Sequence, residues 1–223
     1  MKVTLSAISH PKVEGITSAE DFIGYAARVS NPANQMNTMT ADRLIKYLIR
    51  EKHWSPFEMV SMTVEIETTR DIGRQILRHA SFRFQEFSQR YADVGALGDM
   101  FIFREARLQD DKNRQNSLPV EDEELQAWWL QAQEISAGVA KELYTEALRR
   151  GIAKEQARAL LPEGLTKTRM YMSGTLRSFI HYCDLRCGNG TQLEHKEVAD
   201  GVFKILETEF PNIAEALKSV SNL

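Results

Sequence analysis

The sequence predicts an α+β fold, a single helix-rich domain around a mixed or antiparallel sheet that spans residues 1–223. Three observations predict this fold class. The 223 residues are enough for one substantial core and do not require two. The chain is rich in segments with helical periodicity, and its strand-like segments do not follow the βαβ order of a parallel sheet. No internal repeat, low-complexity stretch or linker divides the chain.

The first 91 residues contain six expected elements. Ser18 can cap a helix whose first turn carries Glu20 and Asp21, which suit the positive end of the helix dipole. Apolar and polar residues alternate from Val60 to Ile66 with the period of a half-buried strand. The expected elements are a strand at Lys2–Ser9, helices at Ser18–Val29 and Ala41–His53 (Leu44, Tyr47 and Leu48 inward), a strand at Phe57–Thr68, a helix from Thr69 or Arg70 to about Ala80, and an extended segment at Phe82–Tyr91.

The remaining residues add mainly helices. Asp110–Pro119 is polar and turn-rich, which predicts a mobile surface loop. A long helix is expected at Glu121–Arg150, because Gly151 suits a left-handed C-terminal cap. The other expected elements are a short helix at Lys154–Leu161 ended by Pro162, a strand at Leu165–Met172, and helices at Thr175–Cys187 and Glu194–Phe210 on either side of a turn at Gly188–Gly190.

The composition is that of an ordinary globular protein, with 43% hydrophobic and 26% charged residues. A net charge of −3 and a pI near 6.0 argue against a general nucleic-acid-binding protein, which is usually basic. The start is too quickly polar for a secretory signal peptide, and no apolar run approaches the roughly 20 residues that span a membrane. We therefore expect a cytoplasmic protein (host-cell cytoplasm if viral) that binds neither nucleic acid nor membrane.

The most informative stretch is RHASFRFQEFSQRY, residues 78–91, which combines three arginines, a histidine and a glutamate with four aromatic rings. Arginine binds phosphate in bidentate fashion, and aromatic rings offer stacking faces. In an extended chain Glu86, Ser88 and Arg90 project to the same side, a spacing that suits a uracil-like edge and a phosphate. The pattern predicts a site for a phosphorylated heteroaromatic molecule. The same three residues also suit the polar outer face of an edge strand.

A basic stripe precedes this stretch. Arg70, Arg74 and Arg78 lie at i, i+4 and i+8 and so share one face of the expected helix. No acidic residue lies four residues from Arg74 or Arg78 to neutralise it. Such a stripe is typical either of a solvated basic face or of an anion-binding site.

The expected helix at 175–187 has one polar and one apolar face. Arg177, His181 and Leu185 share the first face at i, i+4 and i+8, where a lone histidine is more often structural than ligand-binding. Cys183 and Cys187 lie on or near the apolar side. A nucleophilic cysteine needs a nearby base or a helix N-terminus, so we interpret both cysteines as structural. Neither a disulfide framework nor a metal site follows from two such residues.

Together these segments resemble the flavin-dependent thymidylate synthases. The signature of that family is Arg-His-Arg, seven residues and a serine, within a run that ends in Arg-Tyr. This chain has RHA at 78–80, seven residues, and SQRY at 88–91. The blocks HWSPFEM, ARALLPEGLT, MYMSGTLRSFIHYCDLR and GTQLEH match in the same order. The resemblance covers about residues 13–210, and four spaced blocks are far more specific than any one of them.

The resemblance implies an enzyme, a FAD-dependent methyltransferase of dTMP biosynthesis. The implied reaction is the reductive methylation of dUMP to dTMP, with 5,10-methylenetetrahydrofolate as carbon donor and NADPH as reductant. The resemblance also implies a homotetramer whose active sites are shared between subunits, so that one nucleotide is held by arginines from more than one chain.

Carried over residue by residue, the resemblance implies two overlapping sites. The positions that hold dUMP are matched by Gln75, Arg78, Glu86, Phe87, Ser88, Arg90, Arg158 and Arg186. The positions that contact the flavin are matched by Ser55, Glu58, Arg78, His79, Ser81, Arg177, His181 and Leu185. The expected catalytic residues are Arg158 and Arg186, which favour negative charge on the phosphate or the activated uracil ring, and Ser88, a substrate-binding hydroxyl without a convincing base beside it.

Two positions depart from the family pattern. Ala80 replaces the second arginine of the signature, which removes a cation beside the flavin and substrate, and Arg83 is a nearby candidate to supply that charge. Gly190 stands where some members carry a histidine near the flavin. One alternative hypothesis is therefore a family member whose activity is impaired by Ala80.

A second alternative is a single-stranded nucleic-acid-binding module. Phe82, Phe84 and Tyr91 would then form a stacking platform flanked by Arg78 and Arg90. Such binding weakens steeply with salt, and the protein would be colourless, whereas a flavoenzyme is yellow.

Overall fold

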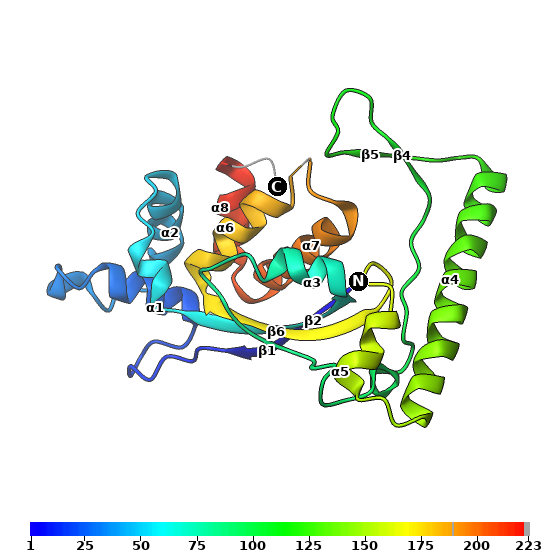
Figure 1. Ribbon diagram of the computed structural model, residues 1–223. Coiled ribbons are helices and arrows are strands. Elements are labelled where there is room, and N and C mark those ends of the chain that lie inside the picture. Colours follow the sequence, from blue (N-terminus) through cyan, green and yellow to red (C-terminus); the bar gives the residue numbers. More distant parts are fainter. Residues whose placement is uncertain (189, 221–223) are drawn as a thin grey trace.

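A four-stranded antiparallel sheet lies at the centre of the chain, with most of the helices above it in the view of Figure 1. The computed structural model describes residues 1–188 and 190–220. The strand order is β1-β2-β6-β3, and a separate two-stranded sheet is formed by β4 and β5. This arrangement confirms the predicted α+β class. The strands are β1 (Lys2–Ile8), β2 (Ser61–Thr69), β3 (Arg83–Glu86), β4 (Arg107–Gln109), β5 (Ser117–Pro119) and β6 (Lys167–Thr175).

The helices expected at 18–29, 121–150, 175–187 and 194–210 begin and end within two residues of their predicted bounds. The α-helices are α1 (Ala19–Ala27), α2 (Ala41–Arg50), α3 (Arg70–Ile76), α4 (Glu123–Arg149), α5 (Lys154–Ala157), α6 (Leu176–Arg186), α7 (Leu193–Glu209) and α8 (Pro211–Val220), and the 3-10 helices are η1 (Pro32–Asn34), η2 (Ser55–Glu58), η3 (Val94–Leu97) and η4 (Arg158–Leu160). Ser18 caps α1 by accepting the backbone N–H of Asp21 at 3.0 Å, and Gly151 follows α4 with φ +82°. None of the described helices has the length and apolar character that crossing a membrane requires.

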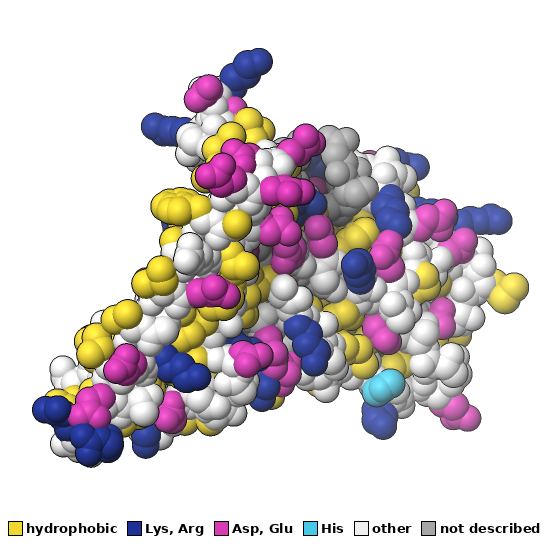
Figure 2. Space-filling model, turned by 90° about the vertical axis from the view of Figure 1, so that its right-hand side faces the viewer, with side chains coloured by type: hydrophobic (Ala, Val, Ile, Leu, Met, Phe, Trp, Pro, Cys, Tyr) yellow, Lys and Arg dark blue, Asp and Glu magenta, His cyan; other side chains and the backbone are white. Residues whose placement is uncertain are grey.

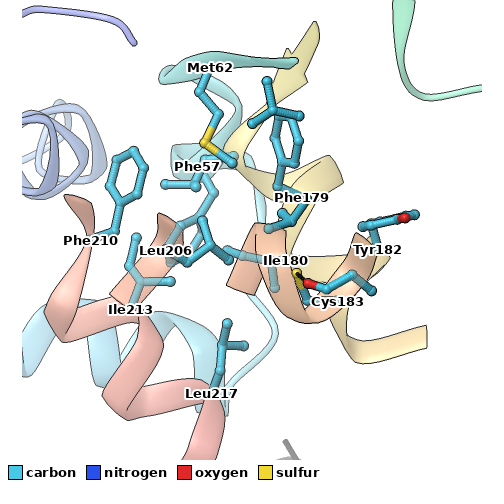
Figure 3. Packing of buried hydrophobic residues seen from close by; sticks show 14 of the residues in the cluster. Phe57, Met62, Phe179, Ile180, Tyr182, Cys183, Leu206, Phe210, Ile213 and Leu217 are labelled. Atoms are coloured by element: carbon cyan, nitrogen blue, oxygen red, sulfur yellow. Dashed lines mark hydrogen bonds between the residues drawn. The ribbon is translucent and has the colours of Figure 1, made fainter. Parts of the chain in front are cut away.

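One face of the sheet packs against α3, α6 and α7 to form the core. Met62, Val64 and Ile66 of β2 are buried on this face because alternate strand residues point to the same side. Figure 3 shows Phe179 and Ile180 of α6 packed in this core beside residues from two further helices, which include Leu206, Phe210, Ile213 and Leu217. Each such side chain contributes about 1.5–3 kcal/mol when it is fully buried.

Cys183 lies in the same core and is fully buried, while Cys187 is half-buried. Burial raises the pKa of the Cys183 thiol well above its ordinary value, so the thiolate that a nucleophile needs is disfavoured. The interpretation of Cys183 as a structural residue is therefore supported.

The opposite face of the sheet is polar and carries cross-strand pairs. The register places Glu67 opposite Arg169 and Glu65 opposite Tyr171. Glu67 pairs with Arg169 at 2.7 Å and with Lys167 at 3.0 Å, and the Tyr171 hydroxyl donates to Glu65 at 2.6 Å. The hydrogen bond from Arg169, followed by that from Lys167, lowers the pKa of Glu67. A one-residue slip would move these charges into the core, so the pairs and the apolar face fix the same register.

Phe82 anchors the 78–91 stretch in the core. Its ring is 3% exposed and lies 4.8 Å from that of Phe179 in an edge-to-face arrangement. Gly174 makes room for the ring, since a Cβ there would lie 2.6 Å from a Phe82 carbon. The base-stacking hypothesis that used Phe82 is therefore wrong at this residue, because a buried ring offers no face to a nucleic acid.

The 78–91 stretch is less extended than predicted. Helix α3 ends at Ile76 rather than near Ala80, because a turn follows in which Phe82 donates its N–H to the His79 carbonyl at 3.1 Å. Strand β3 stops at Glu86, and the backbone N–H of Tyr91 reaches the Ser88 carbonyl at 3.1 Å. The expectation that Glu86, Ser88 and Arg90 project to one side is therefore wrong, since residues 88–91 form a turn.

Two other boundaries, and the inward face of one helix, differ in the first half of the chain. Phe57 lies in η2 and is buried there, so β2 begins at Ser61. Helix α2 ends at Arg50, and Tyr47 is 45% exposed, while Ile45 and Ile49 face the core instead. The inward stripe predicted for α2 is therefore correct for Leu48 but wrong for Tyr47.

The second half also differs in places. The segment expected as a loop at 110–119 is a hairpin, because Arg107–Gln109 pairs with Ser117–Pro119. The helix expected at 154–161 is split into α5 and η4, and β6 continues past Met172 to Thr175. Helix α8 was not expected from the sequence. The predicted turn at 188–190 includes Asn189, which lies outside the described residues.

Candidate active site

Helix α3 separates the predicted site residues into groups. It directly follows β2, so the sheet fixes where it begins. Successive helical residues are rotated by about 100°, and Arg74 and Gln75 therefore face different neighbours. Gln75 contacts His195 of α7 and Gln192, the residue that precedes this helix, whereas Arg74 lies beside Glu86 and Glu163.

Gln75 belongs to a partly buried hydrogen-bonded group that we call the Gln75 network, formed with Tyr182, Gln192, Glu194 and His195. The Gln75 amide nitrogen donates to Gln192 Oε1 at 2.8 Å. Nδ1 of His195 lies 3.2 Å from Gln75 Oε1, and its Nε2 lies 3.1 Å from the Tyr182 hydroxyl. Two predicted site residues lie next to it: Arg186 donates to His79 Nε2 at 3.1 Å, and the His79 ring lies 5.0 Å from that of Tyr182.

Both histidines of this region are neutral at pH 7. Burial, followed by the charge of Arg186 and by His79, lowers the pKa of His195 to about 4. Burial, followed by Arg186 and Arg78, also lowers the pKa of His79. Since Arg186 can only donate, Nε2 of His79 is the acceptor and its proton lies on Nδ1. The site therefore holds an uncharged imidazole beside a guanidinium.

We expect stability to fall in acid partly through His195. The unfolded chain binds a proton near pH 6.5, whereas the folded chain resists it until about pH 4, so stability is lost as the pH falls between these values. The full loss is about 3 kcal/mol, of which about 2 kcal/mol is reached by about pH 5. Urea unfolding of the wild type and of His195→Asn, at one protein concentration, checks this. The free energy of unfolding of the wild type should fall relative to that of His195→Asn as the pH falls. A difference between the two proteins that stays the same at every pH would contradict the expectation.

A second group lines a cleft of about 340 Å³, the Arg158 cleft, between α3 and the segment after α5. Its lining includes Arg70, Arg74, Gln89, Glu155, Arg158 and Glu163. The Arg158 Nε–H donates to the Glu155 carbonyl at 3.3 Å, and among the described residues no carboxylate forms an ion pair with Arg158. Its charge is therefore available to an anion.

Glu86 pairs with two of the arginines that line this cleft, Arg70 and Arg74. It accepts from Arg70 at 3.0 Å and from the Thr168 hydroxyl at 2.9 Å, and Arg74 lies 3.8 Å away. Arg74 also lies 3.5 Å from Glu163. Arg74 is therefore paired, although by carboxylates from outside its own helix, which agrees with the expectation that the helix itself supplies none. Burial is the largest cause that lowers the pKa of Arg70.

A third group, the Glu58 edge, comprises Trp54, Ser55, Glu58, Arg177 and His181. Glu58 and Arg177 form an ion pair that joins η2 to α6. The rings of Trp54 and His181 lie 4.7 Å apart in an edge-to-face arrangement, and burial lowers the pKa of His181. Trp54 and His181 also line a cavity of about 460 Å³. Four residues predicted to contact the flavin are thus adjacent.

The other predicted residues lie apart from these contacts. Ser81 and Leu185 are exposed, and Phe87 is half-buried with its backbone N–H on the Arg169 carbonyl at 2.8 Å. Among the described residues, none hydrogen-bonds the Ser88 hydroxyl. Arg90 is exposed and lies 3.5 Å from Glu155.

Arg83 lies beside the position where the family signature has its second arginine. Its guanidinium donates to the carbonyl oxygens of Ala80 at 3.3 Å and Phe82 at 3.0 Å, so its charge lies next to Ala80. The folded-back side chain thus places a cation beside position 80, where the family signature has its second arginine.

We therefore expect Arg83→Ala to weaken flavin binding about three- to tenfold, because an exposed charge–charge contact is modest. Fluorescence titration of the apoprotein with FAD measures this. Arg83→Lys is the matched control and should retain most of the affinity. Equal affinity of the wild type and the alanine variant would contradict the expectation.

Four residues of the Gln75 network carry no sequence-based assignment: Tyr182, Gln192, Glu194 and His195. A signal for the last of them exists in the sequence. His195 lies on the same helical stripe as Val198, Val202 and Leu206, which places a polar ring at a core position. Nothing in the spacing alone identifies its partners, since they come from other helices.

The chain is similar to known proteins over nearly its whole length. The family model described as "Thymidylate synthase complementing protein" matches residues 13–212. A probable flavin-dependent thymidylate synthase of Paramecium bursaria Chlorella virus 1 is 52% identical over 217 residues, which cover 97% of this chain and 99% of that protein. A flavin-dependent thymidylate synthase of Synechocystis is 50% identical over 201 residues, 90% of each chain.

Solved structures agree with the sequence comparisons. The UMP/dUMP methylase PolB of Streptomyces cacaoi, bound with 5-Br dUMP, superposes with a TM-score of 0.84 at 27% identity. The match covers 100% of this chain and 96% of that one.

Proposed function

This chain belongs to the family of thymidylate synthase complementing proteins, and from this premise we propose that it converts dUMP to dTMP with 5,10-methylenetetrahydrofolate as carbon donor and NADPH as reductant. It is a flavin-dependent methyltransferase whose cofactor is FAD. We further infer that residues 1–223 form a single domain of this kind. The observation that carries the proposal is the cluster of Gln75, His79 and Arg186, which family-matched segments more than 100 residues apart bring together.

The residues present fit a flavin dinucleotide. Arg78 and Arg83 are exposed cations that suit its diphosphate, and the rings of Trp54 and His181 offer apolar surface beside the Glu58–Arg177 pair. When bound, FAD supplies the hydride chemistry of the reaction, and the protein supplies orientation and electrostatics.

Within this proposal, the side chains of the site have distinct tasks. Arg158 and Arg186 attract the phosphate or stabilise negative charge on the activated uracil ring. Neutral His79 accepts a hydrogen bond from Arg186, which holds that guanidinium in place. Gln75 and Ser88 bind the nucleotide through neutral polar groups. Ser88 serves as a binding hydroxyl, since no described residue acts as a base toward it.

We propose a homotetramer whose active sites are shared between subunits. Helix α4 exposes Trp128, Ile135, Val139 and Leu143, the last three at i, i+4 and i+8. Figure 2 shows hydrophobic side chains in a row along a ridge of this face. Such a row is typical of an interface. In addition, Arg158 lines the cleft beside Arg74, whereas Arg186 contacts His79 in another group of residues. A nucleotide that is held by both kinds of arginine would therefore take one of them from a second chain.

The experiment begins with an absorbance spectrum of the purified protein, followed by titration with dUMP and an assay for dTMP. A yellow protein that binds dUMP and forms dTMP only with both methylenetetrahydrofolate and NADPH supports the proposal. A protein that neither takes up FAD nor binds dUMP contradicts it. UMP is assayed in parallel because the solved relative is named as a UMP/dUMP methylase. Light scattering tests the tetramer, and Val139→Glu should dissociate it.

The variant Ala80→Arg separates a fully active natural variant from an impaired one. If Arg83 replaces the missing charge, restoring the arginine changes the rate of dTMP formation less than about threefold. A much larger gain would favour the impaired-enzyme alternative.

A further inference from the structure

The Gln75 network is a continuous chain of hydrogen bonds across three helices. It runs from Tyr182 on α6 through His195 on α7 to Gln75 on α3, at 3.1 and 3.2 Å. From Gln75 it continues to Gln192 at 2.8 Å and to Glu194 at 2.9 Å. His195 is fully buried and is not one of the residues expected to contact dUMP or the flavin.

The direction of donation is set at the carboxylate end of the chain. Glu194 is a carboxylate and only accepts, so Gln192 must point its nitrogen toward Glu194 and its oxygen toward Gln75. Gln75 must then donate through its nitrogen and turn its oxygen to His195. That oxygen only accepts, so the proton of His195 lies on Nδ1, and Nε2 accepts from the Tyr182 hydroxyl. The carboxylate end therefore fixes both the orientation of the Gln75 amide and the tautomer of His195.

The carboxylate end is held firmly. Arg107 pairs with Glu194, and Arg104 lies 3.9 Å from it. Burial favours the protonated form of Glu194, but the hydrogen bonds from its own backbone N–H and from Gln192, with the two arginines, outweigh this effect and lower its pKa. Glu194 is thus an acceptor at neutral pH, and its ionised state orients the whole chain of amides.

We propose that His195 is a positioning residue that fixes the side-chain amide of Gln75 for nucleotide binding. This inference rests on the proposed function, in which Gln75 contacts dUMP. Oε1 of Gln75 accepts from Nδ1–H of His195, and one amide hydrogen is donated to Gln192. Among residues 1–188 and 190–220 the second N–H has no acceptor, and that donor faces a defined direction. Without His195 the amide is free to rotate, and the nucleotide must order it on binding.

The test compares two variants that each keep one half of the ring's hydrogen bonding. His195→Asn places an amide donor near Nδ1, within reach of Gln75, whereas His195→Gln places its amide near Nε2, toward Tyr182. We expect His195→Gln to raise the KM for dUMP about tenfold with a smaller change in kcat, and His195→Asn to raise it less than about threefold. The exposed His10→Asn is the matched control and should behave as the wild type. Equal KM values for the two His195 variants would overturn the proposal.

A double-mutant cycle separates positioning from general loosening of the structure. If His195 acts through Gln75, then His195→Gln should raise the KM further by less than about twofold once Gln75→Met has removed the amide. If His195→Gln raised the KM of the Gln75→Met variant by a further factor of about tenfold, the proposal would be overturned, because a merely structural role does not depend on Gln75. The proposed function fails separately, since in that case the wild type itself would neither bind dUMP nor form dTMP.

Discussion

Arg186→Ala is expected to lower kcat/KM for dTMP formation by about 10²–10³-fold, the usual effect of removing one donor that stabilises developing negative charge. Arg186 is half-buried and is held at 3.1 Å from His79 Nε2, so its guanidinium has a fixed direction. Its removal also takes away a charge that keeps His79 and His195 neutral. Steady-state kinetics with saturating folate and NADPH measures the loss.

Two control variants make this expectation specific. Arg186→Lys keeps the charge but not the guanidinium fork, and should recover only part of the activity. Arg43 is an exposed arginine on α2, and Arg43→Ala should leave kcat/KM unchanged. If Arg186→Ala retained more than about a third of the wild-type activity, Arg186 would not be a catalytic residue.

Glu86→Ala is expected to destabilise the fold by about 3–5 kcal/mol, because it leaves a buried guanidinium without its partner. Arg70 is 8% exposed, and its pair with Glu86 at 3.0 Å is reinforced by the Thr168 hydroxyl. Urea unfolding at one protein concentration measures the change, since any assembly also contributes to apparent stability. Nucleotide binding should weaken as well, because Arg70 and Arg74, which line the Arg158 cleft, lose their shared partner.

The matched control is Glu163→Ala. Glu163 also pairs with an arginine of α3, at 3.5 Å from Arg74, but its side chain is 62% exposed, and its loss should cost less than about 1 kcal/mol. The double variant Arg70→Met, Glu86→Met removes both charges and should be closer to the wild type than Glu86→Ala alone. Equal effects of Glu86→Ala and Glu163→Ala would show that burial does not control the strength of this pair.

Periodicity and capping residues predicted the helices and strands well wherever one local rule applied. Helix α4 begins after Asp122, which accepts two backbone N–H groups, and ends before Gly151 at φ +82°. The alternation around Val64 predicted β2, although not its first residue. Prediction failed where packing overrode the local pattern. Pro56 and the buried Phe57 make a 3-10 turn, and residues 110–119 gain a strand partner that no local pattern encodes.

In the candidate site, too, some features follow from the sequence pattern and others depend on packing. The order of the family blocks was readable, and it predicted Arg186, His79, Glu58 and Arg177 as site residues. Only the structure shows that Glu58 and Arg177 form an ion pair. Whether Ser88 and Arg90 face the nucleotide stays a prediction. Their expected alignment with Glu86 was wrong, because the chain turns after β3.

The stretch at 78–91 shows what each level determined. The sequence alone determined the residue types and their spacing, which carry the family signature and its departure at Ala80. Only the tertiary structure decided that Phe82 enters the core, that Glu86 turns toward Arg70, and that Arg83 folds back beside Ala80. The physical reason is distance along the chain. Spacing fixes which side chains share a face, but Gln75 meets Gln192 across 117 residues and His79 meets Arg186 across 107. Such contacts form only when the sheet and helices close one core.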